Sequence, residues 1–237
     1  ELLTLASDNG YYKASDHLAR IYFEGVIRKK DEKKAIQLFE TAVEGEYTES
    51  ASNLGLLYFN GNGVRKNEKE AVRLFSIASN NNDPRGTFLL AQCYDTGKGV
   101  EVNSVKAIEL YTEALNNGYQ EAANSIFNLH KKLAKKDNIK EILELAKCYE
   151  QGIGVEKSDE EAFKLYEIAS NAGNSEANFI LAELYRNNRI PDNIVPADTP
   201  KEDFCKTNAF KLYDKASKSG HIEASYQLGL CYQQGYG

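Results

Sequence analysis

Histidine is the side chain best suited to proton transfer near neutral pH, and this sequence contains three. They are His17, His130 and His221, which lie in widely separated parts of the chain. Acid–base catalysis or metal binding would require them to meet other titratable groups in one pocket. The spacing indicates no such cluster, and each histidine is best explained as a surface or packing residue. We therefore predict no catalytic residue, no bound metal and no cofactor.

A second feature that could take part in chemistry is the motif Gly-x-Gly-Val, which begins at Gly61, Gly97 and Gly152. Glycine-rich loops that hold phosphate groups follow a β-strand and continue with Lys-Ser or Lys-Thr. Here each motif follows a predicted helix and lacks that continuation. Because glycine adopts the left-handed conformation that ends helices, the motif favours helix termination. A hydrolase would need a convergent set of titratable groups, which the sequence does not indicate.

Four cysteines, Cys93, Cys148, Cys205 and Cys231, could in principle form disulfides. All but Cys205 directly precede a tyrosine, so these three occupy one repeated position. Helix packing would hold successive copies of that position about 10 Å apart, which is too far for a disulfide. We expect free thiols in a reducing compartment, with the cytoplasm favoured and the ER lumen as the alternative.

The composition is that of an ordinary globular protein, with 42% hydrophobic and 27% charged residues in 237. The net charge of -6 makes a broad nucleic-acid or anionic membrane surface unfavourable. No apolar run approaches the roughly 20 residues that a membrane-spanning helix needs, and the start does not resemble a signal peptide. Since methionine is absent even at position 1 and both ends fall inside a repeat, we expect a fragment truncated at both ends.

Helices are the elements that would position these residues, and the stretch Leu54–Ala78 defines them best. Its first part places Leu54, Gly55 and Tyr58 at helical spacing. After a glycine-containing loop, a second apolar stripe starts at Ala71 and continues at i+3, i+4 and i+7. One such hairpin cannot bury its stripes alone, so we expect it to stack on copies of itself.

The same hairpin pattern recurs along the chain. Its landmark tyrosines are Tyr22, Tyr58, Tyr94, Tyr149, Tyr185 and Tyr232, and the first spacings are 58 − 22 = 36 and 94 − 58 = 36. We predict an all-α fold: a right-handed superhelix (solenoid) of antiparallel helix pairs with repeats of about 36 residues. A single domain should cover residues 1–237.

Two segments interrupt the period. The spacing 149 − 94 = 55 leaves an irregular extra segment at 119–138, for which we expect an extra helix and a turn at 136–138. His130 stands there at a position where a tyrosine would be expected. The second interruption, 187–205, holds three of the four prolines, so we expect an extended loop insertion.

The repeated pattern Leu-Gly/Ala-x-x-Tyr-x-x-Gly-x-Gly-Val, then Ala-x-x-x-Tyr/Phe-x-x-Ala, resembles the Sel-one-like repeat family, which is similar to the tetratricopeptide repeat. The residues that carry the match best are Leu54, Gly55, Tyr58, Gly61, Gly63, Val64, Ala71, Phe75 and Ala78. The resemblance implies a scaffold or adaptor, as in ER quality-control adaptors, fungal chitin-synthase activators and bacterial signalling proteins. In a cysteine-rich bacterial branch of the family, a disulfide crosslinks each repeat, and the cysteines here do not match that pattern.

The resemblance also implies that the first helix of each pair lines a concave surface. Transferring that register gives a candidate protein-binding groove with the aromatic residues Phe23, Phe59, Phe88, Phe179 and Tyr226 and the polar residues Asp16, Arg20, Glu24, Asn60, Gln92, Asp95, Lys147, Glu150, Glu183, Arg186, Asn187, Gln233 and Gln234. Aromatic rings bordered by hydrogen-bonding groups suit a bound peptide or helix. Alternatively, these rings pack on neighbouring helices.

The favoured function is a non-catalytic protein–protein interaction scaffold or adaptor that binds a client peptide or partner helix on the concave surface. The partner would be a protein, with no nucleic acid involved. One alternative is a structural spacer or self-association module whose specificity lies in flanking regions. A second is a fragment of an ER quality-control (ubiquitin-ligase) adaptor.

Overall fold

The computed structural model describes residues 1–25, 27–135 and 137–235, and these form helices joined by loops. The helices are α1 (Leu2–Asp8), α2 (Tyr12–Glu24), α3 (Glu32–Glu44), α4 (Glu49–Asn60), α5 (Glu68–Asn80), α6 (Pro84–Thr96), α7 (Ser104–Asn116), α8 (Glu121–Leu133), α9 (Ile139–Gln151), α10 (Asp159–Asn171), α11 (Ser175–Arg186), the 3-10 helix η1 (Asp192–Ile194), α12 (Lys201–Lys218) and α13 (Ile222–Gln233). The predicted all-α class is confirmed.

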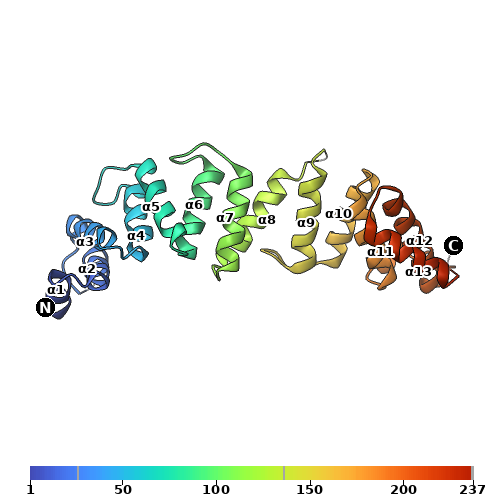
Figure 1. Cartoon of the computed structure of the whole chain (residues 1–237), viewed down its shortest axis with the longest axis horizontal. Helices are drawn as coiled ribbons and strands as arrows, with labels where there is room; N and C mark the ends of the chain where they lie inside the picture. The colour runs from blue at the N-terminus through green and yellow to red at the C-terminus, as the bar shows by residue number, and fades with distance from the viewer. Residues whose placement is uncertain (26, 136, 236–237) are drawn as a thin grey trace. The chain divides into compact units, whose positions relative to one another are not determined.

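Consecutive helices pack as pairs, as Figure 1 shows. The pairs α2–α3, α4–α5, α6–α7, α9–α10 and α11–α12 each correspond to one predicted hairpin. The second helix of a pair then packs on the first helix of the next, for example α5 on α6. The predicted repeat of helix pairs is therefore confirmed.

Local sequence sets the ends of these helices, as the hairpin α4–α5 illustrates. Gly61 ends α4 with a φ of 78°, in the left-handed region where a residue with a side chain is strained. The Asn67 side chain then accepts a hydrogen bond from the backbone N–H of Glu70 at 3.1 Å, which caps the start of α5. The glycine motif thus ends helices in this structure.

The chain divides into two compact units, residues 1–123 and 124–237. In the first unit Leu18, Phe39, Leu54 and Leu74 are among the side chains of the buried core. The boundary falls inside α8, within the segment where the period is interrupted. The single solenoid over residues 1–237 stays a prediction.

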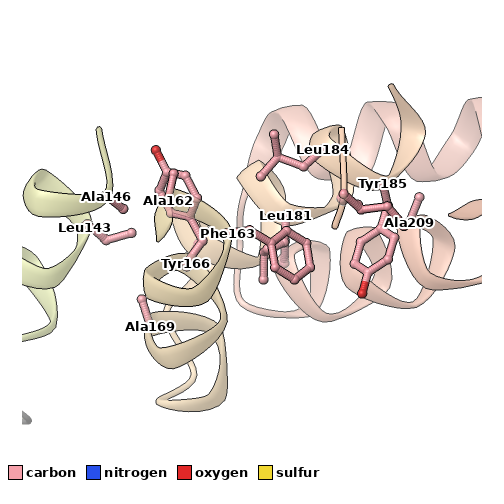
Figure 2. Close-up of a cluster of buried hydrophobic side chains, with 14 of the residues drawn as sticks. Leu143, Ala146, Ala162, Phe163, Tyr166, Ala169, Leu181, Leu184, Tyr185 and Ala209 are labelled. Atoms are coloured by element: carbon pink, nitrogen blue, oxygen red, sulfur yellow. The ribbon is translucent and has the colours of Figure 1, made fainter. Parts of the chain in front are cut away.

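The core of the second unit is built from the small and aromatic landmark residues of α9 to α12. Figure 2 shows Phe163 beside Leu181 and Tyr185, and the ring centroids of Phe163 and Tyr185 are 5.7 Å apart. Alanines such as Ala162 and Ala169 are almost fully buried, which lets the helices approach closely around these rings.

The segment 119–138 contains the regular helix α8. His130 is buried in this helix, and its Nδ1 atom lies 2.6 Å from a carboxylate oxygen of Glu141 in α9. Phe127 makes an edge-to-face contact with Tyr149, with ring centroids 5.4 Å apart. Of the turn expected at 136–138, Lys136 lies outside the described residues.

The segment 187–205 differs from the expected extended loop. Helix α12 already begins at Lys201, so residues 201–205 are helical. Within the loop, Ile190 is buried in the core of the second unit, where Ile194 and Val195 also pack. Arg189 binds Glu150 at 3.2 Å and Asp159 at 2.9 Å. Apolar burial and these ion pairs hold the segment against the repeats, which the count of prolines did not indicate.

Candidate functional site

The three histidines lie in different surroundings. His17 is exposed, and His130 pairs with Glu141 as described above. His221 caps α13: its Nδ1 atom accepts the backbone N–H of Ala224 at 3.1 Å. Among the described residues, no group of three or more His, Cys, Asp or Glu side chains is placed to hold a metal ion.

The four cysteines are free thiols. Burial raises the pKa of Cys93 to about 11, with a smaller contribution from Glu68. Burial likewise raises the pKa of Cys148 to about 11. Because a reactive cysteine needs a lowered pKa and access to solvent, these two are packing residues.

In the first unit, polar side chains connect one first helix to the next. Asp16 of α2 is buried, and one of its carboxylate oxygens accepts hydrogen bonds from Ser50 (2.8 Å) and Asn53 (3.3 Å) of α4. Its other carboxylate oxygen pairs with Arg20 at 2.9 Å. A carboxylate that receives three donors from two helices fixes their relative position.

The same connection continues from α4 to α6. Arg85 of α6 donates to the side-chain oxygen of Asn53 at 2.9 Å. Ser52 of α4 donates to the carboxylate of Asp83, the residue that caps α6. Polar side chains therefore link the first helices α2, α4 and α6. We call the face that carries Arg20, Asn53 and Arg85 the first-helix surface of this unit.

In the second unit, α11 and α13 are joined in a comparable way. Arg186 pairs with Glu183 within α11 at 2.5 Å and donates to Gln227 of α13 at 3.4 Å. The hydroxyl of Tyr213 in α12 donates to Glu183. Glu150 of α9 accepts the hydroxyl of Tyr166 at 2.8 Å. These predicted groove residues are anchored to the second helices behind them.

The aromatic residues predicted for the groove have different environments. Phe88 lies in the core rather than in a groove, because Tyr111 and Tyr119 cover it with ring centroids 5.4 and 4.8 Å away. Phe179 is half-buried and stacks on His221 at 4.4 Å. Tyr226 is 63% exposed. The alternative prediction, packing on neighbours, is therefore correct for Phe88.

Phe23 and Phe59 lie at the ends of their helices, next to the loops. The ammonium group of Lys30 lies over the ring of Phe23 at 5.4 Å, and that of Lys98 over the ring of Phe59 at 5.0 Å. Such contacts between a cation and an aromatic face are attractive. These two rings therefore support basic side chains of the loops.

The remaining candidates differ in exposure. Exposed are Arg20, Glu24, Asn60, Arg186, Asn187, Tyr226, Gln233 and Gln234; half-buried are Phe23, Phe59, Gln92, Asp95, Lys147, Glu150, Phe179 and Glu183; buried are Asp16 and Phe88. Sequence reasoning missed Asn53, Arg85 and Gln227, which bridge successive first helices. Asn53 and Gln227 share one position, five residues before the landmark tyrosine, so extending the register by one helical turn would have found them.

None of the helices in the described part of the chain is long and apolar enough to cross a membrane. The paired helices and the polar first-helix surface define an all-α helical repeat protein of a kind suited to protein binding. The chain belongs to the Sel1 repeat family: the Sel1 repeat matches residues 13–47, 48–83, 84–119, 142–174, 175–221 and 222–237. The matches leave out residues 1–12 and residues 120–141, and the period is interrupted in the second of these segments.

Two solved structures are similar to this chain, and the first shares its fold. A protective antigen present in uropathogenic Escherichia coli strains, displaying an SLR fold, is 24% identical with a TM-score of 0.53 over 98% of this chain and 51% of that chain. The present chain thus spans about half the length of that relative. A Sel1 repeat protein from Oxalobacter formigenes is 25% identical with a TM-score of 0.47, over 94% of this chain and 77% of that one. No curated protein sequence matches the chain.

Proposed function

We propose that the chain is a non-catalytic scaffold or adaptor that binds a client peptide or partner helix on the surface made by its first helices. The observation that carries this proposal is the polar connection Arg20–Asp16–Asn53–Arg85 across α2, α4 and α6. Guanidinium and amide groups held by neighbours lose little further entropy when they bind a peptide backbone. A preorganised polar line on adjacent helices suits an extended or helical client.

The test compares proteins retained by the chain and by two variants in a quantitative pull-down. In the first variant Arg20→Glu and Arg85→Glu reverse charges on the first-helix surface, where both side chains are exposed. In the control, Lys211→Glu and Lys215→Glu make the same change in net charge on exposed positions of the second helix α12.

A client of the first-helix surface should be lost by the first variant, with about tenfold or greater depletion, and kept by the control. The purified client should bind the original chain and the control variant with similar affinity, and the first variant more weakly. Equal retention by all three proteins would refute the proposal. Retention of the chain itself would instead favour the structural, self-associating role.

A further inference from the structure

The first two loops that join first to second helices in the first unit are rich in basic residues. Residues 25–34 contain five basic and two acidic side chains. Residues 61–70 contain three basic and two acidic side chains. The corresponding loop of the fourth repeat, residues 152–161, contains one basic and four acidic side chains. This basic excess is local, because the whole chain has a net charge of -6.

These loops form one continuous edge. The backbone of Gly63 packs so closely on Glu32 at the start of α3 that an added side chain would collide with it. Gly99, in the third loop, packs in the same way on the backbone of Glu68 at the start of α5. We call the edge made by residues 27–34, 61–70 and Lys98 the basic edge.

Aromatic rings hold several of its cations in place. Arg28 and Lys34 lie over the ring of Tyr22 at 5.6 and 5.0 Å, and Arg28 also donates to its hydroxyl at 2.9 Å. Lys30 and Lys98 cover the rings of Phe23 and Phe59, as described above. Basic side chains positioned in this way lose less entropy on binding an anionic group than freely moving ones.

A pocket of about 840 Å³ lies on the same edge, between the second and third loops. Lys66 and Lys69 line one side, and Gly97, Gly99 and Glu101 line the other. We propose that the basic edge binds an acidic peptide segment of a partner protein, with part of that segment seated in this pocket. This second binding surface is separate from the first-helix surface and does not depend on it.

Charge complementarity decides which anion fits. Asp31, Glu32, Glu68 and Glu101 lie among the basic residues along the edge. A nucleic acid carries one charge per roughly 1.7 Å of duplex, and its phosphates would also meet these carboxylates. Carboxylates of a peptide alternate with neutral residues and can avoid them.

A second copy of the chain fits the basic edge less well. Three of the four acidic residues of its fourth loop are already paired: Glu160 and Glu161 both bind Lys164 at 2.9 Å, and Asp159 binds Arg189 at 2.9 Å. An acidic segment from another protein would carry no such internal partners.

The test uses the whole chain and a fluorescein-labelled peptide of alternating glutamate and glycine, followed by fluorescence anisotropy. Lys29→Glu with Lys33→Glu reverses two exposed charges of the basic edge. Lys140→Glu with Lys211→Glu makes the same change in net charge at exposed positions of the second unit.

The basic-edge variant should bind the peptide at least about tenfold more weakly than the control variant, because two attractions become repulsions. Binding should also weaken as salt is raised toward roughly 0.15 M. Circular dichroism of both variants should match the original chain, since all four lysines are exposed.

Three outcomes would overturn the proposal. An equal loss of affinity for the peptide in the two variants would show that binding responds to net charge alone. Tighter binding of single-stranded DNA than of the peptide would assign the edge to nucleic acid. Sedimentation of the chain as a dimer that the basic-edge variant cannot form would make a second copy the occupant.

Discussion

Phe88 and Phe179 occupy the same position in their repeats, six residues before the landmark tyrosine, yet their surroundings differ. The repeat pattern correctly predicts that each ring lies on the first helix of its repeat. It does not predict which side chain covers the ring of Phe88, because the covering ring, Tyr119, belongs to the start of the next segment. His221 lies over Phe179 in the same way. Exposure is therefore set by residues outside the shared pattern.

Cys93 and Cys148 illustrate the opposite case, in which the sequence was sufficient. Their shared place before a landmark tyrosine predicts free thiols, and both are free and buried. Burial raises the pKa of each thiol from 9.0 to about 11. In the unfolded chain these thiols ionise at lower pH, so the folded state loses stability as pH rises from 9 toward 11.

We therefore expect Cys93 and Cys148 in the native chain to react far more slowly with iodoacetamide at pH 8 than the same thiols in urea. Mass spectrometry of the modified peptides measures each site separately. The half-buried Cys231 serves as an internal comparison and should react first. Native Cys93 alkylated as fast as in urea would contradict this burial.

At the scale of the element, one junction is built repeatedly between a second helix and the next first helix. In four places two polar side chains eight residues apart meet there: Ser7 with Ser15 (2.8 Å), Ser79 with Thr87 (3.0 Å), Ser170 with Asn178 (2.6 Å) and Ser217 with Ser225 (2.8 Å). At the other two such junctions, the residues at the same repeat positions are apolar: Val43 with Ala51, and Leu115 with Ala123. Each junction thus matches polar with polar or apolar with apolar.

The pair in the α5–α6 junction provides a stability test. Thr87→Val should destabilise the chain by about 1–3 kcal/mol, because the buried hydroxyl of Ser79 loses its partner. Adding Ser79→Ala should recover part of that loss, since both partners are then apolar as in the Val43–Ala51 junction. Urea unfolding of the four proteins in the cycle measures the coupling. Strict additivity of the two substitutions would show that this hydrogen bond contributes nothing.

The elements themselves were largely predictable from sequence. Alanines and aromatic rings at helical spacing placed the paired helices, and glycines such as Gly61 placed their ends. The segment 187–205 was not predictable, because its structure depends on Arg189 and Ile190 contacting α9 and α10. Contacts between segments far apart in sequence leave no periodic signal. The bridging residue Arg85 was missed for the same reason, whereas Asn53 shares its repeat position with Gln227 and could have been found.

At the scale of the whole molecule, the chain consists of two compact units whose boundary lies in α8. In repeat proteins each repeat contacts mainly its neighbours, so stability is the sum of local contributions. A substitution in the core of one unit should act most strongly on that unit.

Phe163→Ala removes a fully buried ring from the second unit and should cost about 3–5 kcal/mol there. Hydrogen exchange should accelerate in α9 to α12 and remain unchanged in α2 to α5. Phe75→Ala, in the first unit, is the matched control and should give the reverse pattern. Uniform acceleration throughout the chain by either variant would show that the two units unfold as one.

The segment 187–200 has a consequence for engineering this chain. Its two ends are anchored, by Arg189 and Ile190 on one side and by the pair of Lys201 with Asp192 at 2.6 Å on the other. Between them, Pro196 to Asp198 are exposed. Foreign sequence inserted at an exposed tip between fixed ends adds little cost in loop entropy. This tip is therefore a natural place to graft a reporter or a binding epitope.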